Sequence, residues 1–370
     1  MQKYQPSNII RISILIILIS LLVSCTKGIT KIEEEIPKLE KEIELNKTEI
    51  KSPVPIYRTK YMIIVKENST FKQEAERFST KKNAELLTYS KNFNELMSIL
   101  RTKKPIYTAI FATPEELTPD FIDEIDLSLR DIDDDPYLDT AFGILTSRNL
   151  IEFKKYLDRL ISYAPAEKMK IYAVAPKYTY TNLESDFNID IKYHCLTNCG
   201  GTYCICTDDN RATLERIKGG FQNSNIVVMD VHGTPSAMTL DNGEELVGSI
   251  NGLIAKKPTK EIVCYEGKGG GQVCGPKSEE LPISVNTNLV IAESCTTGRI
   301  NGLPNNIETE YGDYNTEGEI NSSLVLSFLQ SGVLNYIAAT HVANTAILPE
   351  ETIIEESFLQ GTPIGVALKD

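Results

Sequence analysis

The chain has 370 residues, 41% of them hydrophobic and 24% charged, and its formal net charge is −13. This length suits one or two globular domains with appendages, and the composition excludes a largely disordered chain. The acidic balance argues against a nucleic-acid-binding protein, because phosphates require clustered lysine and arginine side chains. Eight cysteines are many for a reducing compartment, so the location of the chain is the first question.

The N-terminus has the pattern of an export signal. Lys3 and Arg11 precede an apolar run over residues 12–23, which is followed by Ser24 and Cys25. A run of this length is too short for a transmembrane helix, which needs about 20 residues, but it suits the apolar region of a signal peptide. The sequence LVSC at its end resembles the lipobox of bacterial lipoproteins, which implies cleavage after Ser24 and a lipid on Cys25. An ordinary signal peptide or an N-terminal anchor is the alternative.

The resemblance to lipoproteins also bears on the segments that follow. Thr26, in place of aspartate, implies the bacterial cell envelope, with the outer membrane favoured over the inner membrane. With residues 1–24 as the signal peptide, the Lys/Glu-rich residues 25–54 are predicted to be a solvated tether. Apolar residues at helical spacing leave a short amphipathic helix, and coiled-coil pairing through it, as an alternative, although Pro37 interrupts the pattern.

From Tyr61 onward short apolar runs alternate with longer helical patterns. The sequence predicts strands over residues 61–66, 106–112, 171–175, 226–231 and 289–292, and helical stretches over 71–78, 92–101 and 150–163. The last helix is expected to place Ile151, Tyr156, Leu157 and Leu160 on one face. This alternation, with continuous apolar runs in the later strands, predicts an α/β protein with mostly parallel sheets.

The pattern restarts near Ile171, which predicts two α/β subdomains in series. They are residues 55–168 and residues 169–370, each with a mostly parallel sheet flanked by helices. No Walker-type phosphate loop is present, and the glycines near residue 270 do not open a helix after a strand. We therefore expect no cofactor.

Two predicted strands end in residues that carry chemistry. Residues 226–231 lead directly into His232 and Gly233, and residues 289–292 lead through Glu293-Ser294 into Cys295. The crevice of an open parallel sheet lies beyond the carboxyl ends of its strands, so neighbouring strands would bring this imidazole and thiol together. A thiolate beside an imidazole can attack a carbonyl, and the N–H groups of Gly233 and Cys295 can hold the oxyanion. Taken singly, each residue is more often structural, since a lone buried cysteine usually serves as a small hydrophobe.

An apolar strand ending in His-Gly, followed by an apolar strand ending in acid-x-Cys-x-x-Gly, resembles the clan CD cysteine peptidases, which include caspases and legumains. The chain is most similar to the gingipain family. Residues 131–146, before the predicted helix, and the stretches 321–340 and 361–369 resemble parts of that family, so the similarity covers about residues 60–370. The resemblance implies a caspase-like fold and a Cys295–His232 dyad acting on peptide or protein substrates.

The chain also departs from the gingipain pattern. The connection between His232 and Cys295 is longer than expected, and its excess holds a Gly-rich segment that we predict to be an inserted hairpin. The specificity acid of the family, which selects Arg or Lys before the scissile bond, matches no single position. Glu184, Asp186, Asp190 and Glu293 are the candidates, with a preference for Asp or Asn as the alternative.

Six further cysteines are disulfide candidates in an exported chain. They are Cys195, Cys199, Cys204, Cys206, Cys264 and Cys274, of which Cys264 and Cys274 form the most plausible local pair. Zinc binding by His194 and the first four is the alternative, but their spacing fits no common zinc module and we expect no metal. His194 and His341 are expected to be structural.

These observations predict a lipid-anchored cysteine endopeptidase. A non-catalytic surface lipoprotein that uses a caspase-like fold as a binding scaffold is the main alternative. A zinc-dependent hydrolase built on the cysteine cluster is the third possibility.

Overall fold

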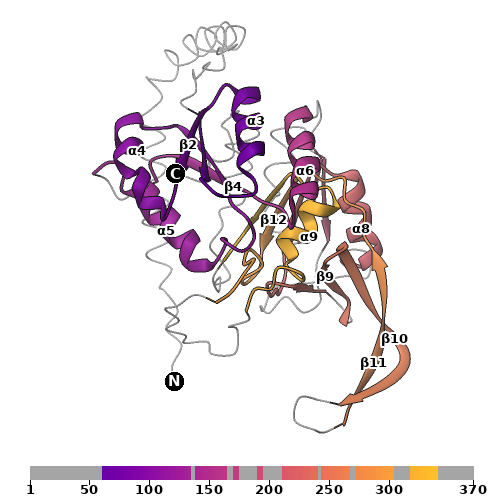
Figure 1. Ribbon diagram of the computed structural model, residues 1–370. Helices are drawn as coiled ribbons and strands as arrows, with labels where there is room; N and C mark the ends of the chain where they lie inside the picture. The colour runs from indigo at the N-terminus through magenta and orange to yellow at the C-terminus, as the bar shows by residue number, and fades with distance from the viewer. Residues whose placement is uncertain are drawn as a thin grey trace, which may run out of the picture. The chain divides into compact units, whose positions relative to one another are not determined.

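Two parallel sheets flanked by helices and one antiparallel sheet make up the fold (Figure 1). The computed structural model describes residues 61–134, 138–164, 170–174, 190–194, 211–240, 243–266, 272–303 and 317–340. The prediction of an α/β protein with two parallel sheets is confirmed. The antiparallel sheet is an addition, of which the sequence indicated only the inserted hairpin.

The first sheet has four strands in the order β2-β1-β3-β4, all parallel. They are β1 (Tyr61–Lys66), β2 (Glu85–Tyr89), β3 (Tyr107–Phe111) and β4 (Ala141–Leu145). The intervening helices are α3 (Lys72–Lys82), the 3-10 helix η1 (Phe93–Leu96), α4 (Met97–Lys103) and α5 (Pro119–Arg130). Helix α5 begins where the sequence favours a start, since the Thr118 side chain accepts a hydrogen bond from the Phe121 N–H and Pro119 occupies the first turn.

The second sheet has five strands in the order β13-β12-β7-β5-β6, again all parallel. They are β5 (Lys170–Val174), β6 (Asp190–His194), β7 (Ile226–Asp230), β12 (Leu289–Glu293) and β13 (Asn335–Ala338). Helices α8 (Leu214–Asn223) and α9 (Leu324–Ser331) accompany it, and α6 (Leu150–Ser162) precedes it in the chain. Strands β7 and β12 lie inside the sheet and are buried on both faces, which explains their unbroken apolar runs.

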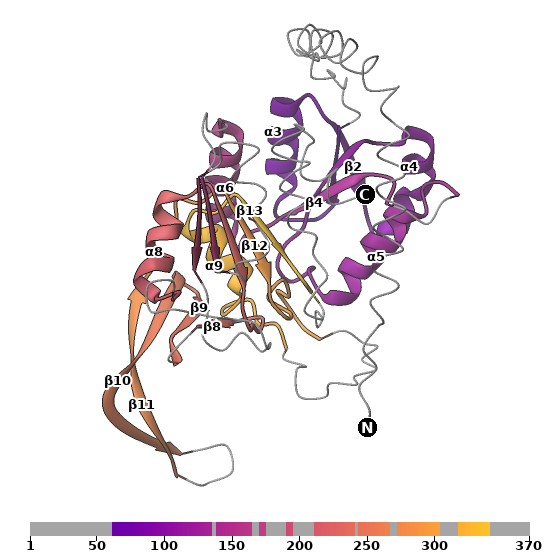
Figure 2. The same cartoon turned by 180° about the vertical axis from the view of Figure 1, so that it is seen from behind.

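The antiparallel sheet has the order β11-β10-β9-β8. Its strands are β8 (Ala237–Thr239), β9 (Glu245–Ser249), β10 (Gly252–Glu266) and β11 (Gln272–Pro282). β9 covers only the first residues of β10, so the distal part of the β10–β11 hairpin continues alone (Figure 2). Cys264 lies opposite Cys274 in the register of this hairpin, and the two form a disulfide. Both the inserted hairpin and its disulfide were predicted.

Helix α6 shares a buried core with the first sheet and with α9. Phe153, Tyr156 and Leu157 of α6 are buried in one cluster with residues of β1 and β3 and with three α9 residues, Val325, Leu326 and Leu329. The Tyr156 hydroxyl also donates to the Leu334 carbonyl at 3.0 Å. Helix α6 therefore joins the elements of the two parallel sheets.

One prediction about α6 is wrong. Ile151 is 70% exposed, whereas Phe153 is fully buried. Ile151 lies in the first turn of the helix, where the Asn149 side chain caps its N–H. The apolar face is therefore made by Phe153, Tyr156 and Leu157, and it excludes Ile151.

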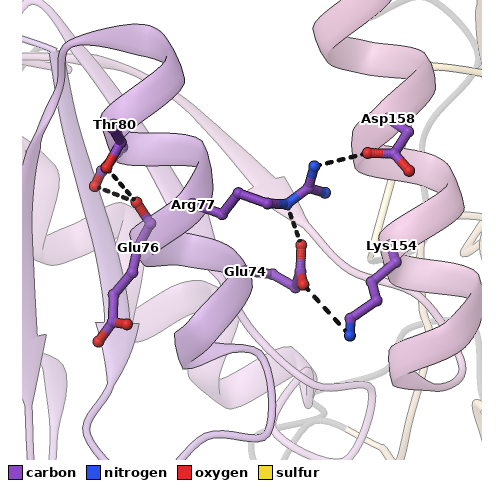
Figure 3. A network of polar contacts seen from close by, with 7 residues as sticks. Glu74, Glu76, Arg77, Thr80, Lys154 and Asp158 are labelled. Carbon is purple, nitrogen blue, oxygen red and sulfur yellow. Dashed lines mark hydrogen bonds and ion pairs between the residues drawn. The ribbon is translucent and has the colours of Figure 1, made fainter.

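An ion-pair network joins α6 to α3 (Figure 3). The Arg77 guanidinium donates to Glu74 at 2.6 Å and to Asp158 at 2.7 Å. Lys154 lies 3.7 Å from the second oxygen of Glu74, whose carboxylate is nearly buried. The buried carboxylate is thus neutralised by cations from both helices, as a desolvated charge requires.

Candidate active site

Strands β7 and β12, which precede His232 and Cys295, are direct neighbours in the second sheet. They pair in parallel, and Glu293 lies opposite Asp230 at the end of the ladder. His232 follows Asp230 by two residues, and Cys295 follows Glu293 by two residues. The register therefore brings both candidate residues to the same carboxyl edge of the sheet, where crevices of parallel sheets form.

The turn that carries Cys295 is in contact with the loop that carries His232. Gly233 is the contact point, because a Cβ placed on it would lie 2.3 Å from Thr297 Cγ2 and 2.8 Å from Ser294 Cβ. Ser294 and Thr297 bracket the cysteine. Only glycine permits this approach, so the glycine after the histidine has a steric reason in addition to any role toward substrate.

The cysteine turn is tight and its backbone is constrained. Thr296 has a φ of 54°, in the left-handed region that β-branched residues rarely adopt. The Thr297 hydroxyl donates to the Ser294 carbonyl at 3.2 Å and closes the turn. The Gly298 N–H donates to the Ala339 carbonyl at 2.8 Å, which ties the turn to the segment after β13. This arrangement leaves Cys295 partly exposed, with its sulfur as a thiol outside any disulfide.

The antiparallel sheet holds the backbone of the histidine loop. The Thr239 N–H donates to the His232 carbonyl at 2.8 Å, and the Thr234 N–H donates to the Ala237 carbonyl at 2.8 Å. Gly233 forms a bridge with Met238 between these two bonds. In antiparallel geometry the flanked residue directs its own N–H away from the partner strand. The Gly233 N–H thus points away from β8, and it donates none of the backbone bonds found among the described residues.

A half-buried acid and a buried arginine flank the site. Burial raises the pKa of Asp230, and the positive charge of His232 opposes that rise. Arg299 is 1% exposed, its Nε donates to the Thr340 carbonyl at 3.1 Å, and burial lowers its pKa. His232 itself is exposed at the surface. The site therefore combines an accessible imidazole and thiol with a supporting layer of buried polar groups.

The remaining predicted residues are placed as follows. His194 ends β6, stacks on Tyr172 with ring centroids 5.2 Å apart, and is half-buried, which fits a structural role. Its pKa is lowered, chiefly by burial, with contributions from Arg216 and Lys192. The described residues contain no group of three metal-ligating side chains. The following lie outside the described residues: the signal peptide, the tether, Cys25, Cys195, Cys199, Cys204, Cys206, Glu184, Asp186 and His341.

Of the specificity candidates, the backbone positions of two can be compared. Asp190 begins β6, opposite Lys170, and so lies at the amino edge of the sheet. Glu293 ends β12, at the carboxyl edge, in register with Asp230. The carboxyl edge is where Cys295 and His232 lie, so the backbone position of Glu293 suits a substrate pocket better than that of Asp190.

The sequence interpretation missed Asp230 and Arg299. Asp230 is the single charged residue in the run IVVMDV, and a charge at the end of an otherwise apolar strand was a usable signal. Arg299 gave no such signal, because an arginine after a turn is ordinarily exposed.

Searches of protein-family models, curated proteins and solved structures find nothing that matches this chain. Among the described residues, no helix is both long and apolar enough to cross a membrane.

Proposed function

We propose that the protein is a cysteine endopeptidase of the gingipain type, with a caspase-like fold, in which Cys295 is the nucleophile and His232 its acid–base partner. The observation that carries the proposal is the pairing of β7 with β12, which brings the two residues to one sheet edge. The contact of Gly233 with the cysteine turn supports it. The substrate would be a peptide or protein.

The chemistry is an acyl transfer through a thioester. The Cys295 thiolate attacks the scissile carbonyl carbon, a C–S bond forms, and the oxyanion is held by the N–H groups of Gly233 and Cys295. His232 protonates the leaving amine as the C–N bond breaks. Water then attacks the thioester, gives a proton to His232, and releases the carboxylic acid and the thiolate.

The test uses Cys295→Ala and His232→Ala in the mature protein, assayed with a fluorogenic peptide panel that varies the residue before the scissile bond. Each variant should lose at least about 10³-fold in kcat/KM, while its unfolding free energy stays within about 1–2 kcal/mol of wild type. A thiol-reactive probe should label wild type but not Cys295→Ala. Cleavage that persists in Cys295→Ala would refute the proposal, and an unreactive, inactive wild type would favour the scaffold.

We further propose that a lipid on Cys25 anchors the protein in the bacterial cell envelope, on the outer membrane. The support is the lipobox-like sequence that precedes this residue. Cys25→Ser should abolish incorporation of labelled fatty acid and move the protein from the membrane to the soluble fraction. Unchanged labelling of the variant would contradict the anchor.

A further inference from the structure

The geometry points to Asp230 as a positioning residue that holds the imidazolium form of His232. This inference rests on the proposed Cys295–His232 pair and adds a third group to it. Asp230 was not among the residues that the sequence interpretation selected.

The side chains of β7 alternate between the two faces of the sheet. Val227, Met229 and Val231 all belong to one buried apolar cluster, so the alternation continues past the last ladder residue. Asp230 and His232 therefore share the opposite face. Successive residues on one face of a strand are about 6.6 Å apart along it, and the Asp230 carboxylate and the His232 imidazole are close enough to interact electrostatically.

The surroundings of Asp230 do not indicate a structural role for its carboxylate. The carboxylate is half-buried at the end of an apolar strand, where a charge is costly. Burial accordingly raises its pKa, and His232 is the charge that acts in the opposite sense. Among the described residues, none forms a hydrogen bond or an ion pair with this carboxylate, and the electrostatic effect of His232 is its one charge interaction. A charge kept here at a cost to stability is typical of a functional group.

The other titratable groups near His232 come from the neighbouring elements. Strand β12 contributes Cys295 and the ladder position of Glu293. The turn after it contributes Arg299, which donates to a backbone carbonyl. Tyr336 of β13 is in register with Val290 and packs against the cluster of Val227, Met229 and Val231, on the other face of the sheet. The residues of β8 are not titratable. Asp230 is thus the acid of β7 itself that shares a face of that strand with the imidazole, and Glu293 is its ladder neighbour on β12.

A negative charge beside an imidazole favours its protonated form. In the proposed pair, the Asp230 charge therefore favours the state in which Cys295 is a thiolate and His232 an imidazolium. The alternative state, a thiol beside a neutral imidazole, lacks the thiolate that acts as the nucleophile. Without the charge, His232 loses its proton at lower pH. A variant without this charge is therefore expected to hold less of the reactive thiolate near neutral pH.

The test measures the pH dependence of Cys295 alkylation by iodoacetamide in the full chain, with the modified peptide quantified by mass spectrometry. This readout needs no substrate. Asp230→Asn should lower the alkylation rate at pH 6 about threefold or more, which corresponds to half a pH unit. Asp230→Glu should retain over half of the wild-type rate. Glu215→Gln, which removes an exposed charge from the first turn of α8, is the matched control and should change nothing.

Stability provides the check on folding. Because the charged form of Asp230 is disfavoured by burial, Asp230→Asn should melt no lower than wild type at pH 7. Any stability advantage of Asp230→Asn over wild type should disappear as the pH falls below 3.8, the ordinary pKa of aspartate. Below that pH the Asp230 carboxyl of wild type is protonated and uncharged as well. If the asparagine variant does not fold, Asp230→Ser is measured in the same way.

The outcomes separate this inference from the proposed function. An unchanged alkylation profile in folded Asp230→Asn overturns the positioning role. Asp230→Asn could also leave the alkylation profile unchanged and lose only the cleavage after Arg or Lys. That result would assign Asp230 to the substrate pocket and would likewise overturn the positioning role. If His232→Ala leaves alkylation at pH 6 unchanged, the Cys295–His232 pair itself is refuted.

Discussion

At the scale of single residues, the candidate site depends on how closely two loops approach. Gly233 lets the histidine loop contact the turn formed by Ser294 and Thr297, with no room for a side chain between them. This cysteine turn also holds Thr296 in a left-handed conformation. Conformations of this kind persist only where the surrounding structure enforces them, and they cluster at functional sites.

Gly233→Ala should therefore destabilise the protein by about 1–3 kcal/mol, because its Cβ overlaps Thr297 and Ser294. It should also move the histidine loop away from the cysteine turn and reduce the proposed peptidase activity at least tenfold. Urea unfolding followed by circular dichroism measures the first effect. Gly143→Ala is the control, since its added Cβ meets nothing within 4 Å and should shift the unfolding free energy by less than about 1 kcal/mol.

At the scale of elements, helix α8 shows how packing decides the role of adjacent glycines. Gly219 and Gly220 are consecutive in this helix, where glycine is unfavourable relative to alanine. A Cβ on Gly219 meets nothing within 4 Å, but one on Gly220 would lie 2.4 Å from the Tyr172 ring of β5. The helix approaches the sheet through the second glycine.

The two alanine variants should consequently differ in sign. Gly219→Ala should raise the unfolding free energy by about 0.5–1 kcal/mol through helix propensity. Gly220→Ala should lower it by about 1–3 kcal/mol, because Tyr172 is buried and must move. Thermal melting of the pair measures both effects, and a stabilised Gly220→Ala would show that α8 does not pack on the sheet this closely.

At the scale of the whole folded part, Arg148 connects elements that are distant in sequence. Its guanidinium, after β4, donates to Gln330 and Ser327 of α9, the latter at 2.7 Å. Ser327 accepts a hydrogen bond at 3.0 Å from the N–H of Ser249 in β9. The side chain is half-buried, and this burial lowers the Arg148 pKa to about 10. One side chain thus links the end of the first sheet, a helix of the second and the antiparallel sheet.

Arg148→Met should lower the unfolding free energy by about 2–3 kcal/mol, because it leaves buried acceptors on α9 without their donor. The chain has no tryptophan, so tyrosine fluorescence and circular dichroism are the probes. Both should show one shared transition, since α6 and α9 occupy a common core. Arg101→Met removes an exposed ion pair with Asp131 and should cost less than about 1 kcal/mol. Two separated transitions in wild type would contradict the shared core.

The strands that build the candidate site could be predicted from the amino-acid sequence. The apolar runs ending at His232 and before Cys295 predicted β7 and β12 closely, because strands buried on both faces need unbroken apolar residues. The pairing of Cys264 with Cys274 also followed from local spacing. These features depend on residues near one another in the chain, so local patterns reveal them.

Features that depend on which elements become neighbours follow from the packing of the folded chain. The sequence could only suppose that β7 and β12 are adjacent, because β8 to β11 intervene in the chain. Nor did periodicity alone exclude Ile151 from the buried face of α6, since the packing partners of a helix select its face. The burial of Arg299 likewise arises from contacts between distant segments. Those contacts set burial and charge, and the residue types alone do not.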